Sequence, residues 1–166
     1  MNYLGIDPGA SGGLVLIFED GSIEADPMPD SLNGLADWIS DCPSNTIAVV
    51  EKVHALPNNA TRAAFKFGYN VGSIHMVLTC FSIPYLLVTP RKWMDELGLR
   101  KKEKGEKTSS WKGYLQEVAE SLFPSIHITR KTADAFLIAA YCRRIYSEIE
   151  QRIKEENLNG RPRQPS

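Results

Sequence analysis

Three carboxylates occur at the edges of apolar segments, where an acid is costly to bury. Asp7 ends the run "YLGID", Glu51 ends "TIAVVE", and Asp134 lies near the start of the apolar stretch "TADAFLIAAYC". A lone buried carboxylate needs a partner cation or an exit to water. If the three side chains meet, they offer the oxygen ligands that Mg²⁺ prefers, with room left for water and substrate phosphates. They are therefore the candidate catalytic and metal-binding residues.

The commoner role of a single acid at the end of a strand is to cap a helix or to pair with a basic side chain. That role stays open for each of the three taken alone. Two observations favour a shared site. The same arrangement occurs three times, and strand ends in an open α/β sheet converge on the crevice where ligands bind.

The elements that must position these acids are predicted from the spacing of apolar residues and turn signals. The first three strands are joined by short turns, which indicates an antiparallel meander. The later strands alternate with helical stretches, which indicates parallel strands. The predicted fold class is therefore α/β, with a mixed five-stranded sheet flanked by helices. The predicted strands are residues 2–7, 12–18, 22–26, 45–53 and 83–90. One helix is predicted to begin after residue 31, and three more are predicted at 60–81, 110–122 and 132–150.

Composition suits one soluble domain. The chain has 166 residues, of which 43% are hydrophobic and 23% charged, enough to bury a core. We assign residues 1–150 to this domain and expect the polar segment 151–166 to be a disordered tail. Three widely spaced cysteines, the lack of a leader and the lack of an apolar stretch of roughly 18 residues predict a reduced, cytoplasmic protein with no membrane partner.

The formal net charge is −1, so a nucleic-acid partner would have to be met by a local basic patch. Residues 91–110 supply such a patch and are predicted to form a short helix and then an exposed loop. Their cations could neutralise backbone phosphates without reading base sequence. The alternative is an ordinary solvated loop. The candidate DNA-binding cations are Arg91, Lys92, Arg100, Lys101, Lys102, Lys104, Lys107 and, nearer the third acid, Arg130 with Lys131.

Three segments resemble, in order and spacing, the motifs of the RuvC-type Holliday-junction resolvases of the RNase H-like (retroviral integrase) superfamily. They are "LGIDPGASGGLVLI", "VVEKVHALPNNATRAAFKFGYNVGSI" and "TADAFLIAAY", and the likeness covers roughly residues 1–146. The resemblance implies an RNase H-like fold and an endonuclease that makes paired cuts in four-way junctions and related branched DNA. Such a protein would act in the cytoplasm of a bacterial or phage-infected cell, and the divergent motifs suggest a phage-borne member.

The resemblance also implies the chemistry. Asp7, Glu51 and Asp134 would hold two Mg²⁺ ions per active site, with Asp7 between them and with Mn²⁺ able to substitute. One ion would help to form hydroxide from water, and the other would stabilise the leaving 3′ oxygen. The products would carry 5′-phosphate and 3′-hydroxyl ends.

One position departs from the family pattern. Three residues before the last Asp the family usually carries Asp or His as a fourth ligand, and this sequence has Lys131. A protonated ammonium group cannot ligate a metal ion. Three interpretations stay open: Lys131 points to solvent, it contacts the scissile phosphate as a further catalytic residue, or this helix is misaligned with the family.

Two further features concern DNA distortion and assembly. His54 follows Glu51 where related resolvases often place an aromatic wedge, so His54 and Asn58–Asn59 could stack on or bind bases, although a lone His is more often structural. A four-way junction is two-fold symmetric, so paired cuts imply a homodimer. The predicted interface is the helix at 60–81, whose small residues permit close packing but would equally suit packing on the sheet. These small residues are Ala63, Ala64, Gly68 and Gly72.

Two other functions compete with the resolvase. The first is a catalytically weak or inactive relative that binds branched DNA, which Lys131 and the modest charge favour. The second is an actin-like ATP-binding protein, because "GIDPGASGG" also resembles the first phosphate loop of that superfamily. Such proteins are far longer, and the sequence contains no second phosphate loop. DNA cleavage that depends on Mg²⁺ would distinguish the nuclease from the inactive DNA-binding relative. ATP turnover would identify the actin-like protein.

Overall fold

The computed structural model describes residues 1–9, 11–53 and 61–159. Its centre is a five-stranded sheet in the order β3-β2-β1-β4-β5, with β1 in the middle. The strands are β1 Asn2–Asp7, β2 Gly13–Ile17, β3 Ile23–Pro27, β4 Thr46–Glu51 and β5 Tyr85–Val88.

The strand directions follow from the lengths of the connections. Short turns join β1 to β2 and β2 to β3, and both pairs are antiparallel. Along the chain, one helix precedes β4 and another connects β4 to β5. In the sheet β4 pairs with β1 and β5 pairs with β4, and both of these pairs are parallel. The predicted mixed sheet, a meander followed by parallel strands, is therefore confirmed.

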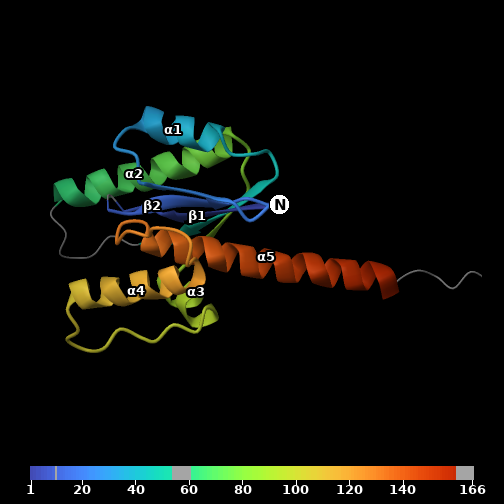
Figure 1. Ribbon diagram of the computed structural model, residues 1–166. Helices are drawn as coiled ribbons and strands as arrows, with labels where there is room; N and C mark the ends of the chain where they lie inside the picture. The colour runs from blue at the N-terminus through green and yellow to red at the C-terminus, as the bar shows by residue number, and fades with distance from the viewer. Residues whose placement is uncertain (10, 54–60, 160–166) are drawn as a thin grey trace, which may run out of the picture.

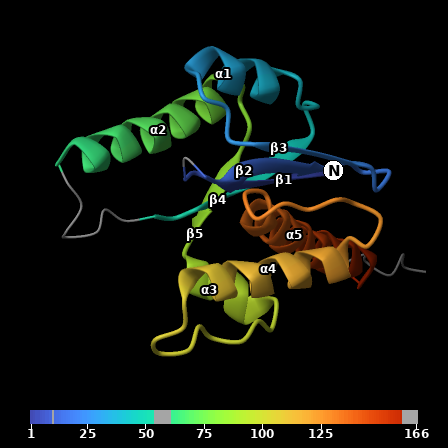
Figure 2. The same cartoon turned by 60° about the vertical axis from the view of Figure 1, so that its left-hand side comes forward.

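Helices cover both faces of the sheet, as Figures 1 and 2 show. On one face lie α1 and α2, and on the other lie α3, α4 and α5. The helices are α1 Leu32–Ser40, α2 Thr61–Cys80, α3 Pro90–Glu96, α4 Thr108–Leu122 and α5 Ala133–Asn159.

Each central strand sends alternate side chains into two separate cores, because successive residues of a strand point to opposite faces. In β1, Leu4 and Ile6 belong to the core beneath α1 and α2, whereas Tyr3 belongs to the core beneath α5. In β4, Val50 lies with the first group and Val49 with the second. Residues of β1 with odd numbers therefore face α5, and so do those of β4.

The contact between β1 and α5 depends on Gly5. A Cβ atom added at Gly5 would collide with the backbone of Ala135 and Ala139 in α5. Those two positions carry small side chains, so the helix and the strand approach with no bulky group between them. This close contact fixes the start of α5 over the end of β1.

The last helix is longer than the sequence predicted. It runs for 27 residues to Asn159, so the expected disordered tail is wrong for residues 151–159, and the helix crosses the predicted domain boundary at residue 150. Its second half contains no Gly or Pro and is supported by pairs one turn apart, such as Arg144 with Glu148 and Gln151 with Glu155. In Figure 1 this half extends beyond the sheet. Within the described ranges, no helix is apolar over the length needed to cross a membrane.

Candidate active site

Two of the predicted acids stand side by side at the ends of parallel strands. The register pairs Ile6 of β1 with Val50 of β4, which makes Asp7 and Glu51 the next neighbours along the two strands. Both have odd numbers in strands whose odd residues face α5. The strand pairing and the alternation therefore bring the two carboxylates to the same edge and the same face of the sheet.

The third acid comes from the first turn of α5. Asp134 is adjacent to Ala135, one of the two residues that lie against Gly5. The carboxyl groups are close enough that Asp134 raises the pKa of Asp7 and of Glu51. Asp7 and Asp134 are buried, with 9% and 8% of their surfaces exposed. The three acids therefore lie near one another, and their role as metal ligands stays a prediction.

The loop after β1 is built tightly around Asp7. The backbone N–H of Gly9 donates a hydrogen bond to Oδ1 of Asp7 at 3.2 Å. A Cβ atom at Gly12 would collide with the backbone carbonyl of Asp7 and lie 2.7 Å from its carboxyl carbon. The small residues of this turn therefore let the chain fold back while leaving the carboxylate in place.

Burial and the charges of neighbouring acids raise the pKa values of Asp7 and Glu51. Burial raises the pKa of Asp7, and the charge of Asp134 raises it further, while the Gly9 N–H and Lys112 act in the opposite direction. Burial, followed by the charge of Asp7, raises the pKa of Glu51 to about 7. The indole N–H of Trp93 in α3 donates to Oε2 of Glu51 at 3.0 Å and partly offsets that rise. Positive charge near this group of carboxylates is therefore stabilising.

One residue of the site, Lys112 of α4, was not predicted from the sequence. Its ammonium group donates to Oδ2 of Asp134 and forms an ion pair with it. Burial acts to lower the pKa of Lys112, but the attraction of Asp134, with Asp7 and Glu51 further away, raises it overall. A signal did exist in the sequence. Lys112 stands three residues before Leu115 and seven before Ala119, on the buried stripe of its helix.

The site has the donor chemistry of a divalent-metal centre. All three acids are hard oxygen donors, and Oδ1 of Asp134 is buried without any hydrogen-bond partner. Within the described part of the chain, however, no three side chains of ligand type are yet gathered around one point. Lys112 provides the positive charge instead. The residues that would hold a metal ion are Asp7, Glu51 and Asp134.

The other predicted catalytic residue, Lys131, is exposed just before α5. It is not among the groups that shift the pKa of Asp7 or Glu51, whereas Lys112 is. In the described structure the lysine beside the carboxylates is therefore Lys112. A role for Lys131 toward phosphate stays a prediction.

The predicted DNA-binding cations fall into three groups. Arg100 is already occupied, because its guanidinium donates to both carboxylate oxygens of Glu106, at 2.7 and 3.0 Å. Arg91 is highly exposed and pairs with Asp95 at 3.4 Å. The rest are exposed on or after α3 or just before α5, namely Lys92, Lys101, Lys102, Lys104, Lys107 and Arg130. His54 and Asn58–Asn59 lie outside the described residues.

The small residues predicted for a dimer interface lie on α2. Gly68 and Gly72 are exposed, and a Cβ atom added at either would meet nothing within 4 Å. They do not pack on the sheet, so that alternative is wrong for these two glycines. Next to them Phe65 is 76% exposed, Tyr69 54% and Met76 57%. This outer face of α2, defined by Phe65, Tyr69 and Met76, is apolar and uncovered in the described chain.

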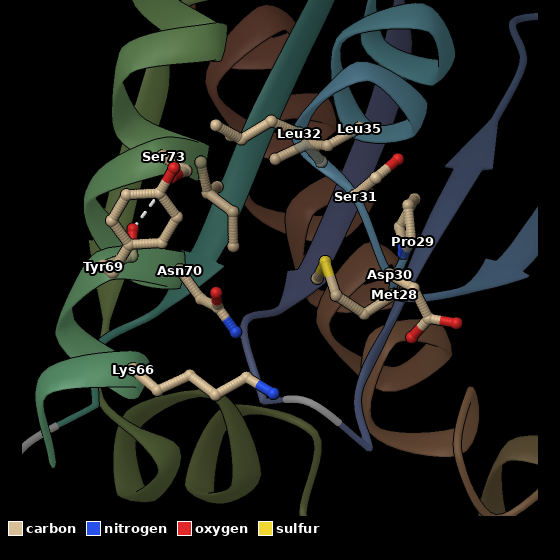
Figure 3. A pocket seen from close by; sticks show the side chains of 11 residues that line it. Met28, Pro29, Asp30, Ser31, Leu32, Leu35, Lys66, Tyr69, Asn70 and Ser73 are labelled. Atoms are coloured by element: carbon tan, nitrogen blue, oxygen red, sulfur yellow. Dashed lines mark hydrogen bonds between the residues drawn. The ribbon is translucent and has the colours of Figure 1, made fainter. Parts of the chain in front are cut away.

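A cavity on the face of the sheet away from the acids has no comparable chemistry. It lies between α1 and α2, and Figure 3 shows Lys66, Tyr69 and Asn70 of α2 around it. Its volume is about 120 Å³, below the ~300–1,000 Å³ of most small-molecule sites. Ser73, on its wall, already donates its hydroxyl to the Tyr69 carbonyl at 2.8 Å. We therefore place the candidate active site at the carboxylates.

Comparison with known proteins identifies the fold. At the level of sequence, the chain matches no protein-family model and no curated protein. At the level of structure it is similar to RuvC of Thermus thermophilus in complex with a Holliday junction substrate, with a TM-score of 0.59 and 16% identity over 90% of this chain and 96% of that one. A second Thermus thermophilus RuvC structure gives a TM-score of 0.56 and 16% identity over 90% and 97%. The RuvC-like, RNase H-like fold implied by the motifs is confirmed.

Proposed function

We propose that this RuvC-like chain is a divalent-metal-dependent endonuclease that cuts branched DNA, four-way junctions included. The observation that carries the proposal is the convergence of three carboxylates, Asp7, Glu51 and Asp134, from β1, β4 and α5. Its substrate class is supported by the Holliday junction bound to the RuvC structure of the same fold. The expected products carry 5′-phosphate and 3′-hydroxyl ends.

The three carboxylates would bind Mg²⁺, or Mn²⁺ in its place. When bound, such an ion supplies Lewis-acid polarisation of a phosphate oxygen and lowers the pKa of a coordinated water. Metal binding requires deprotonated ligands, so Glu51, whose pKa is about 7, gives up its proton as the site is loaded. The buried Trp93 holds Oε2 of Glu51 in one orientation by its N–H donor.

Lys112 has a defined task in this scheme. It forms an ion pair with Asp134 and so supplies a positive charge beside the three acids before a metal ion binds. A metal ion and the ammonium group would then compete for Asp134. The side chain of Lys112 is 32% exposed, so its release toward solvent or a DNA phosphate requires only a side-chain rotation.

DNA would be held by the exposed cations around α3 and α4 and before α5. They are Arg91, Lys92, Lys101, Lys102, Lys104, Lys107 and Arg130. These contacts carry no base information, so the affinity should fall steeply as the salt concentration rises. A salt-independent affinity would contradict them.

Paired cuts require two sites related by two-fold symmetry, so we propose a homodimer. The outer face of α2 is its interface, because Phe65, Tyr69 and Met76 are exposed there beside two glycines that permit close approach. On this arrangement the two sets of carboxylates act on opposite strands of one junction.

The decisive experiment is cleavage of labelled four-way junction, replication fork and linear duplex with Mg²⁺ or with a chelator. Wild type should cut the branched substrates symmetrically, only with Mg²⁺, and leave nicks that DNA ligase seals. Asp7→Asn should bind the junction but cut it at least about 10³-fold more slowly, because a metal ligand is lost. An Asp7→Asn protein that cuts at the native rate would overturn the proposal.

A second candidate function is binding of branched DNA without cleavage. The observation that favours it is the ion pair of Lys112 with Asp134, together with Lys131 at the position of the family's fourth ligand. Junction binding by wild type with no cleavage in either Mg²⁺ or Mn²⁺ would select this candidate. Cleavage of forks as well as junctions would instead widen the substrate class of the nuclease.

A further inference from the structure

A recess of about 380 Å³ lies between α3, the segment that follows it, and α4. Three buried or half-buried side chains form its floor, namely Met94, Leu99 and Trp111. Its volume is within the ~300–1,000 Å³ of small-molecule sites, and an apolar floor with a few polar groups is their usual lining. The recess is therefore large enough for one planar ring system.

One wall of the recess is a fixed guanidinium group. Arg100 is held by two hydrogen bonds to Glu106, and its Cζ atom lies 4.3 Å from the centre of the Tyr114 ring and 5.2 Å from that of Trp111. These contacts hold the planar group in one orientation. Arginine planes and aromatic rings are the surfaces on which unpaired bases stack in nucleic-acid complexes.

The rim of the recess is positively charged. Arg91, Lys101 and Lys102 face a single carboxylate, Asp95, which pairs with Arg91. The charge of Arg100 is balanced by Glu106 and does not add to this excess. An apolar floor beneath cations complements a nucleotide, whose base is planar and whose phosphate is anionic.

The recess adjoins the carboxylates through both helices. In α3, Trp93 donates to Glu51 while its neighbour Met94 lines the recess. In α4, Lys112 contacts Asp134 while its neighbour Trp111 lines the recess. The recess and the carboxylates are therefore neighbours, because adjacent residues of the same two helices contact both.

We propose that this recess binds one unstacked base of the DNA strand that passes the carboxylates, and so helps to set where the strand is cut. The inference rests on the proposed function, since it needs DNA at the neighbouring site. Unstacking a base costs least where the duplex is already disrupted. A base site beside the active site therefore favours branch points over continuous duplex.

The test is an abasic scan of a four-way junction. Binding is measured by fluorescence anisotropy in the Asp7→Asn background, which prevents cleavage, with a single abasic site placed at each position around the branch in turn. One position should weaken binding by about five- to hundredfold, the range of base–aromatic stacking. That position should lie close to the mapped cut.

Two variants assign the effect to the recess. Met94→Glu places a carboxylate on the floor of the recess and should exclude the base. The variant should then bind the junction equally well with and without the abasic site. Met94→Ala, which shortens the same side chain without adding charge, serves if the first variant does not fold and should reduce the abasic effect at least about threefold. Lys154→Ala, on the exposed far half of α5, is the matched control and should keep the full effect.

The outcomes separate the two proposals. Junction binding that is insensitive to every abasic site, or equally sensitive in wild-type and Met94 variants, overturns the base site and leaves the nuclease untouched. A protein that binds no branched DNA at all overturns the proposed function together with this inference.

Discussion

The two faces of the sheet use alternate residues of the same strands for different purposes. The core beneath α1 and α2 receives apolar side chains from the two central parallel strands, such as Ile6 and Val50. The face beneath α5 receives the last residue of β1 and of β4, and both of these residues are acids, Asp7 and Glu51. A shift of one residue in register would exchange the two sets. The comparison shows that strand register, rather than the apolar character of a segment, decides which acid enters the site.

The two faces also differ in how closely their helices are held. On the acid side α5 lies directly on the backbone of β1 at Gly5. On the other side the first half of α2 is largely exposed, with Phe65 among its most accessible residues. The contact between α5 and β1 therefore fixes the spacing of the elements that carry the acids. On the opposite face, α2 leaves an exposed surface that is free for association. The predictions below test this difference.

The largest effect is expected at Gly5. Gly5→Ala forces α5 away from β1, because the added methyl group meets the backbone of Ala135 and Ala139. The free energy of unfolding should fall by about 3 kcal/mol or more. Gly113→Ala in α4 is the matched control, since no atom lies within 4 Å of its added Cβ, and it should stabilise the helix by up to about 1 kcal/mol. Urea unfolding followed by circular dichroism measures both, and equal effects would contradict the close contact.

The next effect concerns pH. The pKa of folded Glu51 is about 7 against an ordinary value of 4.5, so the folded state keeps this proton to higher pH than the unfolded state does. Without metal, stability should therefore fall by about 2–3 kcal/mol as the pH rises from about 4.5 to about 7. In Glu51→Gln the free energy of unfolding should fall less steeply with rising pH. It should still fall, because the raised pKa of Asp7 contributes as well.

Denaturant unfolding in chelator across this pH range checks the Glu51 prediction. Above about pH 7 Glu51→Gln should be the more stable protein, since its amide oxygen can still accept the Trp93 N–H bond and carries no charge to desolvate. An unchanged slope would mean that Glu51 is not the titrating group. Asp20→Asn, on an exposed turn, controls for the loss of one acid.

A smaller effect is expected at Lys112. Lys112→Met leaves Asp134 without its cation and should cost about 2 kcal/mol in the absence of metal, less than for a fully buried pair because the lysine side chain is 32% exposed. Added Mg²⁺ or Mn²⁺ should then raise the midpoint of thermal unfolding more in the variant than in wild type. Lys154→Met, exposed on α5, is the control. An equal metal response in variant and wild type would show that the ion pair does not compete with metal.

The smallest effect tests the opposite face. Phe65→Asp should weaken the proposed dimer at least about tenfold, or about 1.4 kcal/mol, while leaving the fold of each protomer unchanged. Leu122→Asp at the end of α4 introduces the same charge at another exposed apolar residue and should leave the dimer intact. Sedimentation equilibrium measures both. Wild-type protein that stays monomeric at every concentration would remove α2 as the interface.

The sequence was most informative where one strong rule applies. Short apolar runs bounded by turn signals predicted the strands, and the expense of burying charge singled out Asp7, Glu51 and Asp134. The alternation of short turns and helical stretches predicted the mixed sheet. These rules are local, and the structure confirms what they predict about the fold.

The sequence was least informative where a side chain chooses among distant partners. A lysine on an amphipathic helix usually extends to solvent, and Lys112 was not predicted to belong to the site although it lies on the buried stripe. Arg100 was counted among free cations, because charge composition does not reveal that Glu106 binds it. The polar composition of residues 151–159 suggested disorder, yet these residues continue a helix already nucleated in the core.

The contact of Gly5 with α5 has a consequence for biosynthesis. The central strand is made first, but the helix that covers it belongs to the last part of the described chain, so the contact joins residues of very large sequence separation. At the usual pace of translation, several seconds pass between the synthesis of Glu51 and that of Asp134. During that interval the nascent chain carries two acids, an uncovered apolar strand and no Asp134. Only a chain translated through α5 can assemble the site, and a prematurely terminated product is left with its central strand open to aggregation.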